Sequence, residues 1–123
     1  MVVDCHVHTR DFEEAHKETI EHALLVARES GVDGIFAMPN TKPPLTDEEI
    51  VIRYHKLAEQ AGVGDVFFGI YLGLTKDIEQ VKRAVDLSRK FPWIVGFKMY
   101  WGESTNPVIS VVEKDDQYRV IET

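Results

Sequence analysis

The sequence predicts an α/β fold in which parallel strands alternate with helices in the order βαβαβαβ. Four short, nearly continuous apolar runs alternate with three segments whose apolar residues recur at helical spacing. Such runs are typical of parallel strands that are covered on both faces. The helices between them supply the crossover connections that parallel neighbours require. We therefore expect residues 1–123 to form a single α/β domain.

Each element of this fold has its own sequence signals. The expected strands are Val2–Val7, Gly34–Met38, Val66–Leu72 and Ile94–Tyr100, and the expected helical segments are Glu14–Ser30, Thr46–Ala61 and Thr75–Lys90. Gly31 ends the first helix. Thr46 is the candidate N-cap of the second, in a capping box with Glu49, and Thr75 is the candidate N-cap of the third. Beyond these, Val108–Glu113 is expected to form a short strand and Asp115–Thr123 a further helix.

The spacing of the units indicates a larger architecture. Each strand–helix unit occupies about 30 residues, close to the spacing in a (β/α)₈ TIM barrel, and a closed barrel takes about 250 residues. Four units make about half of such a barrel. An open sheet of four strands is the alternative, but we expect the chain to be the N-terminal portion of a barrel. Its fourth strand is then an open edge, which favours self-association or pairing with a complementing chain.

Composition excludes several classes of function. The chain has 14 Lys and Arg against 21 Asp and Glu, a net charge of −7, so it lacks the basic face that nucleic-acid binding needs. No apolar stretch approaches the length of a membrane span, and the N-terminus has no signal-peptide pattern. A single cysteine, Cys5, fits a reducing compartment, so we expect a cytoplasmic protein. Cys5 itself is expected to pack as a small apolar residue.

Two histidines, His6 and His8, stand at the end of the first expected strand. Side chains two residues apart in a strand point to the same face, so the two imidazoles can share one metal ion. The carboxyl ends of parallel strands are where α/β enzymes place their active sites. From these residues alone, a chance histidine pair at a strand edge has about equal weight.

Two polar residues follow the ends of the first and second strands. Arg10 lies two residues after the histidine pair, where a guanidinium can hold a carboxylate through two hydrogen bonds. Asn40 lies in a proline-rich loop and offers both a donor and an acceptor. A solvated surface arginine and a structural turn asparagine are the alternatives.

Lys98 lies within the fourth apolar run, where a charged amine is costly unless it is paired or neutralised. Three explanations stay open: a Schiff-base lysine, a salt-bridged lysine, and a lysine whose amine has become a carbamate. A carbamate is anionic and has two oxygens, so it can bridge two metal ions as a carboxylate does.

Taken in order, three segments resemble the dihydroorotases of the amidohydrolase superfamily. They are His6–Asp11, Met38–Pro44 and Phe97–Tyr100, and the resemblance spans nearly all of the chain. Hydantoinases and allantoinases share the His-x-His motif, whereas the arginine that follows it favours dihydroorotase. The loop Glu103–Asn106 loosely resembles the Thr-Asn-rich loop of one dihydroorotase branch.

The resemblance implies a metal-dependent barrel hydrolase with two Zn²⁺ ions in its complete site. Such an enzyme acts on a small cyclic amide and interconverts N-carbamoyl-L-aspartate and dihydroorotate in pyrimidine biosynthesis. His6 and His8 would bind zinc, and Lys98, as the catalytic carboxylysine, would bridge both ions. Arg10 and Asn40 would bind the substrate carboxylate.

The family also uses two later histidines and a general-base aspartate, which these residues do not include. We therefore expect the 123 residues alone to be inactive. One alternative is a catalytically silent dihydroorotase-like scaffold that supports a partner enzyme. Another is a metal-dependent phosphoesterase of the polymerase-and-histidinol-phosphatase type, which explains the histidines but not Arg10, Asn40 and Lys98 together.

Overall fold

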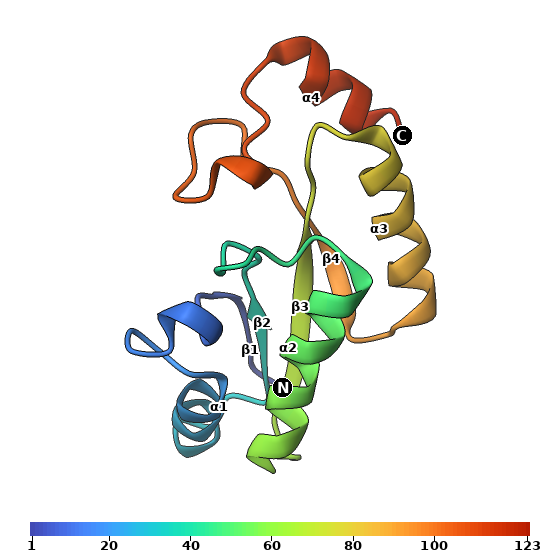
Figure 1. Cartoon of the computed structure of the whole chain (residues 1–123). Helices are drawn as coiled ribbons and strands as arrows, with labels where there is room; N and C mark the ends of the chain where they lie inside the picture. Colours follow the sequence, from blue (N-terminus) through green and yellow to red (C-terminus); the bar gives the residue numbers. More distant parts are fainter.

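The computed structural model describes residues 1–123 and contains one parallel sheet with strand order β1-β2-β3-β4 (Figure 1). The strands are β1 (Val3–Val7), β2 (Gly34–Ala37), β3 (Phe67–Gly73) and β4 (Ile94–Lys98). The helices are α1 (Ile20–Glu29), α2 (Glu48–Ala61), α3 (Ile78–Lys90) and α4 (Lys114–Ile121), and the 3₁₀ turns are η1 (Phe12–Glu14) and η2 (Pro107–Ile109). The expected parallel βαβαβαβ order is confirmed, and β4 is an edge of the sheet as predicted.

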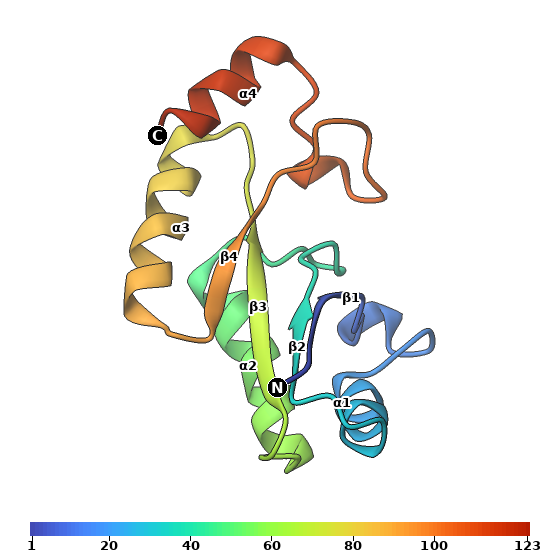
Figure 2. The ribbon, with the colours of Figure 1, turned by 180° about the vertical axis from the view of Figure 1, so that it is seen from behind.

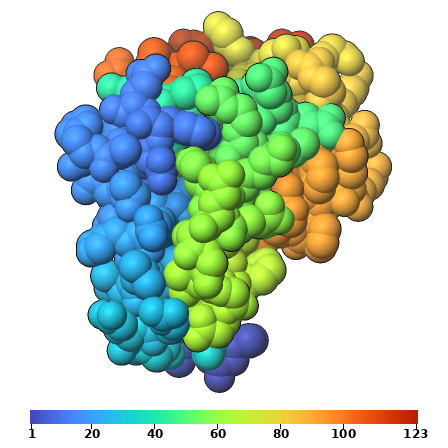
Figure 3. Space-filling model, turned by 60° about the horizontal axis from the view of Figure 1, so that its bottom comes forward, coloured from blue at the N-terminus to red at the C-terminus, as the bar shows by residue number.

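Helices α1, α2 and α3 cover one face of the sheet, and the view from behind shows the opposite face free of helices (Figure 2). In the space-filling view the segments that contain α1 and α2 lie directly against each other (Figure 3). The prediction that the strands are covered on both faces is therefore wrong within these residues. On the uncovered face Phe36 packs against Phe67, which is 49% exposed.

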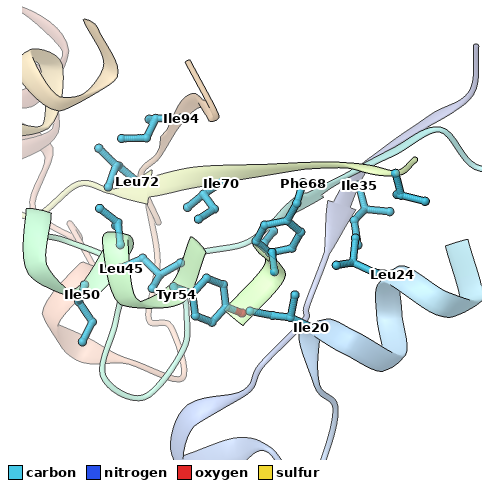
Figure 4. Close-up of a cluster of buried hydrophobic side chains, with 14 of the residues drawn as sticks. Ile20, Leu24, Ile35, Leu45, Ile50, Tyr54, Phe68, Ile70, Leu72 and Ile94 are labelled. Atoms are coloured by element: carbon cyan, nitrogen blue, oxygen red, sulfur yellow. The ribbon is translucent and has the colours of Figure 1, made fainter. Parts of the chain in front are cut away.

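The hydrophobic core lies between the covered face and the helices (Figure 4). Alternate strand residues point into it, among them Ile35, Phe68 and Ile70. Leu24 of α1 and Tyr54 of α2 meet them from the helical layer. These contacts hold the carboxyl ends of the strands in fixed relative positions.

The first helix begins later than predicted. Helix α1 begins at Ile20, and the hydroxyl of Thr19 caps it by accepting a hydrogen bond from the His22 backbone N–H at 3.2 Å. The predicted start at Glu14 is wrong because residues 10–12 adopt a left-handed backbone and residues 12–14 form a single 3₁₀ turn.

Aspartates, not threonines, cap the next two helices. Asp47 accepts a hydrogen bond from the Ile50 backbone N–H at 3.1 Å, and Asp77 accepts one from Glu79 at 3.0 Å. The predicted caps at Thr46 and Thr75 are wrong, although both residue types are good N-caps. In each case an aspartate stands closer to the first helical turn, where its carboxylate also favours the positive end of the helix dipole.

The last part of the chain is mostly irregular before α4. The expected strand at 108–113 is wrong: this stretch contains part of η2 and one isolated parallel bridge between Tyr100 and Ser110. The expected final helix is confirmed as α4, which packs through Val120 against Val81 of α3. None of the helices is long and apolar enough to cross a membrane.

Cys5 is exposed, so the prediction that it packs as an apolar residue is wrong. The reason is local. Strand β1 is the other edge of the sheet, and its pairing with β2 is irregular between Asp4 and Val7.

Candidate functional site

The polar residues predicted for the site gather at the carboxyl ends of β1, β2 and β4. The rings of His6 and His8 lie on the same side of β1, with their centroids 5.2 Å apart. Lys98 is the last residue of β4 and is half-buried. Two strands separate β1 from β4 in the sheet, yet the charge of Lys98 acts on His8.

Several neighbours act on the protonation of His8. Partial burial lowers the pKa of His8 because it disfavours the charged imidazolium. A hydrogen bond with Asn40 raises the pKa, and the positive charges of Arg10, His6 and Lys98 lower it further. The net direction is downward, which favours the neutral imidazole, the form that binds metals.

Asn40 fixes which nitrogen of His8 is free. The Asn40 Oδ1 atom lies 2.9 Å from His8 Nδ1, and an amide oxygen can only accept a hydrogen bond. His8 Nδ1 therefore carries the proton, and Nε2 keeps its lone pair for a metal ion. The Asn40 Nδ2 group donates to the Thr105 hydroxyl at 3.5 Å, so the loop after β4 also reaches this asparagine.

Arg10 binds to the same segment from the other side. Its Nη1 donates to the Asn40 backbone oxygen at 3.1 Å and to Glu14 Oε1 at 3.4 Å. The hydrogen bonds of the guanidinium to the protein come from Nη1, and the Nη2–Nε edge makes none. That edge can take a carboxylate through two parallel hydrogen bonds. His8, Asn40 and Arg10 thus form one continuous chain of contacts.

Glu14 is the buried counter-ion of Arg10, with its side chain 5% exposed. Its other oxygen pairs with Lys17. The hydrogen bond from Lys17 lowers the pKa of Glu14, burial opposes this, and the charge of Arg10 lowers the pKa further. The resulting pKa is below its ordinary value, so Glu14 stays ionised and holds the guanidinium in place.

A left-handed turn directs Arg10 toward β2. Arg10, Asp11 and Phe12 have φ values of 48°, 57° and 45°, a conformation that is strained for residues with a side chain. The Asp11 carboxylate stabilises the turn by accepting hydrogen bonds from the backbone N–H groups of Phe12 and Ile20, both at 3.0 Å. Because no glycine stands in the turn, this conformation could not be predicted from the sequence.

Tyr54 of α2 fixes the turn from the core side. Its hydroxyl donates to the Arg10 backbone oxygen at 3.1 Å and lies 2.7 Å from the Thr9 hydroxyl. A phenol has one proton, so Thr9 is the donor in the second contact. Both side chains are fully buried, and burial raises the pKa of Tyr54. Sequence reasoning missed both residues, because a tyrosine among apolar helix positions does not reveal its hydroxyl partners.

Lys98 and Tyr100 complete the β4 side of the site. Lys98 forms no salt bridge in residues 1–123, so the salt-bridged explanation of its position is not realised there. Its Nζ atom lies 5.4 Å from the ring centroid of Tyr100. Burial raises the pKa of Tyr100, and the charge of Arg10 opposes this. Sequence reasoning did not select Tyr100.

The residues meet the needs of a metal site in part. His6 and His8 offer two imidazoles side by side, and His8 has the required tautomer. No group of three or more His, Cys, Asp or Glu side chains that could hold a metal occurs in residues 1–123. Structural and catalytic zinc sites have three or four protein ligands. Lys98 becomes a ligand only if its amine carries a carbamate.

Comparison with known proteins identifies relatives of the chain. No protein-family model matches the chain. The dihydroorotase of Pyrococcus furiosus is 32% identical to it over 121 residues, which are 98% of this chain and 26% of that protein. The chain is related to the dihydroorotases. It spans about a quarter of the length of those relatives.

Solved structures agree on the fold. Dihydroorotase from Saccharomyces cerevisiae, in complex with 5-fluoroorotic acid, is 26% identical, with a TM-score of 0.69 over 96% of this chain and 30% of that one. L-Hydantoinase (dihydropyrimidinase) from Arthrobacter aurescens is 24% identical, with a TM-score of 0.72 over 97% of this chain and 25% of that one. Both are amidohydrolases with TIM barrels. The expectation of a partial amidohydrolase barrel is therefore confirmed.

Proposed function

We propose that these residues are part of a zinc-dependent cyclic amide hydrolase that interconverts N-carbamoyl-L-aspartate and dihydroorotate in the cytoplasm, as a step of pyrimidine biosynthesis. The observation that carries the proposal is the contact chain from His8 through Asn40 to Arg10, which joins a candidate metal ligand to a candidate carboxylate clamp. The dihydroorotase relatives support the same substrate class. A phosphoesterase leaves this contact chain and those relatives unexplained.

Arg10 and Asn40 are the proposed carboxylate-binding pair. Glu14 and the Asn40 backbone oxygen hold one nitrogen of the guanidinium, so the opposite edge faces a ligand without having to reorganise. The Asn40 Nδ2 contact with Thr105 is 3.5 Å long, at the limit of a hydrogen bond. A ligand oxygen can replace this weak contact at little cost.

His6, His8 and Lys98 are the proposed metal-binding residues. Bound zinc would polarise the amide carbonyl of the ring as a Lewis acid. Lys98 forms no salt bridge, and its Nζ atom lies 5.4 Å from the ring centroid of Tyr100. A carbamate on its amine would supply two anionic oxygens to a metal site that otherwise has only the two imidazoles.

We also propose that the 123 residues alone are inactive, because two imidazoles and one lysine do not make a complete zinc site. The remaining ligands come from another segment or from a complementing chain. The chain can therefore be tested inside a relative. In the dihydroorotase chimera, this chain replaces the 121 aligned residues of the Pyrococcus furiosus enzyme. We expect the chimera to bind zinc and open the ring of L-dihydroorotate.

Substitution of Lys98 tests the metal assignment within the dihydroorotase chimera. Lys98→Ala should lose zinc and turnover together, because it removes the bridging group. The matched control is Lys82→Ala on the exposed surface of α3, which should retain both. A folded, zinc-loaded chimera that leaves dihydroorotate intact would contradict the proposed function. Zinc retained in full by Lys98→Ala would contradict the bridging role.

A further inference from the structure

The hydroxyl of Tyr100 is buried and has no hydrogen-bond partner. Every other buried side-chain nitrogen or oxygen of the chain has a partner. Leaving a buried hydroxyl unpaired costs free energy, and native proteins rarely do so. An unpaired group of this kind therefore calls for an explanation. At a candidate binding site, a missing ligand is the first to consider.

The position of Tyr100 is fixed by its backbone. Tyr100 forms a parallel bridge with Ser110, and its backbone oxygen accepts a hydrogen bond from the Val111 N–H at 2.8 Å. The backbone of Tyr100 is thus held by the segment that contains Ser110 and Val111.

The surroundings of Tyr100 are those of the proposed site. The Lys98 Nζ atom lies over its ring, and the positive charge of Arg10 acts on its hydroxyl. An anionic ligand atom is the natural partner for a hydroxyl in this positive environment. At neutral pH a phenol keeps its proton, so it can donate.

Tyr54 provides an internal comparison. Its hydroxyl is also buried, but it has two protein partners, the Arg10 backbone oxygen and the Thr9 hydroxyl. Tyr54, on the core side of Arg10, therefore has a fully paired hydroxyl, whereas Tyr100, on the β4 side, has an unpaired one. The protein leaves unpaired the tyrosine hydroxyl whose ring lies under the Lys98 amine.

We propose that the Tyr100 hydroxyl is a further ligand-binding group, which donates a hydrogen bond to an anionic oxygen of a small carboxylate ligand that Arg10 also attracts. The inference rests on the proposed function and adds one residue to its substrate site. A neutral donor would give the carboxylate a preferred orientation without adding charge.

The test is Tyr100→Phe in the dihydroorotase chimera, with the melting temperature and the KM for L-dihydroorotate as the two readouts. Loss of an unpaired hydroxyl should leave the melting temperature of the ligand-free chimera unchanged or slightly raised. The same substitution should raise the KM for L-dihydroorotate by roughly tenfold or more. A purely structural hydroxyl predicts the opposite pattern, with lower stability and unchanged binding.

Two control variants calibrate the result. Tyr54→Phe removes a hydroxyl with two partners and should lower the melting temperature clearly. Tyr118→Phe removes an exposed hydroxyl on α4 and should change neither readout. If Tyr100→Phe lowers the melting temperature as much as Tyr54→Phe, the hydroxyl is structural and the inference is wrong.

The KM measurement distinguishes the proposed function from the role of Tyr100. If the folded, zinc-loaded chimera leaves dihydroorotate intact, the proposed function fails and the Tyr100 inference fails with it. If the chimera and its Tyr100→Phe variant have the same KM, only the role of Tyr100 is refuted.

Discussion

The helix-covered face of the sheet and the carboxyl ends of its strands differ in how completely their side chains are paired or packed within the chain. On the helix-covered face Ile70 and Leu72 have no exposed surface, and the layer is closed by side chains of the same chain. At the carboxyl ends of the strands, Arg10 has a free edge and Tyr100 an unpaired hydroxyl. Side chains that are packed within the chain stabilise the fold, whereas polar groups without a protein partner can bind a ligand. Ile70 and Leu72 therefore belong to the first kind, and Arg10 and Tyr100 to the second.

The largest expected effect lies on the covered face. Ile70→Ala should lower the free energy of unfolding by about 2–5 kcal/mol, because it leaves a cavity in a closed core. Phe67→Ala removes a larger side chain from the uncovered face, where 49% of it is already exposed, and should cost less. Urea denaturation of both variants measures the difference. A greater loss of stability for Phe67→Ala would contradict the view that the covered face contributes more to stability than the uncovered one.

The second-largest effect on stability is expected for the turn before α1. Asp11→Ala removes the acceptor for two backbone N–H groups and places alanine in a left-handed conformation. We expect a loss of about 1–2 kcal/mol in the free energy of unfolding. Asp11→Asn keeps an acceptor and tolerates the backbone, so it should lose less. Equal losses for both variants would show that the carboxylate charge, not the geometry, holds the turn.

The smallest effect concerns pH and His55, at the end of the covered layer away from the site. His55 stacks on Trp93 with ring centroids 4.2 Å apart, and burial lowers the pKa of His55, with Glu59 opposing. The unfolded chain then binds the proton more tightly. The stability that neutral His55 contributes is therefore fully present above the unfolded pKa of about 6.5. It is lost as the pH falls toward the lower pKa of the folded state.

His55→Gln should flatten this slope. Urea denaturation at about pH 7.5 and pH 5.5 brackets the unfolded pKa of histidine. The loss of stability between the two values should be smaller in His55→Gln than in the unsubstituted chain. His8 titrates with the same sign and is unchanged in the variant, so the difference belongs to His55. An unchanged slope would mean that His55 has the same pKa in both states.

Local sequence patterns predicted the framework because apolar runs and helical spacing report burial directly. The four strands and the helices between them lie within a few residues of their expected positions, except for the start of α1, which is at Ile20 and not at Glu14. The ends of the helices were less predictable. Thr46 and Asp47, or Thr75 and Asp77, are competing caps a residue or two apart, and the residue that directly precedes the first helical turn is the cap.

The candidate site also contains residues that the sequence predicts and residues that it does not. His6, His8, Arg10, Asn40 and Lys98 could be chosen from the sequence because each is polar and follows or ends an apolar run. The residues that hold these side chains in position could not be chosen in this way. Tyr54, for example, contacts Arg10, which lies 44 positions away in the sequence. No local pattern encodes such a contact.

The central claim is that Arg10 belongs to a carboxylate-binding site beside the metal ligands. Its most direct test compares kcat/KM for L-dihydroorotate and for 5,6-dihydrouracil, the same ring without the carboxylate, in the dihydroorotase chimera. The chimera should prefer dihydroorotate. Arg10→Met should reduce that preference by about tenfold to a hundredfold, with zinc content unchanged. An unchanged preference in a folded, zinc-loaded Arg10→Met variant would contradict the account.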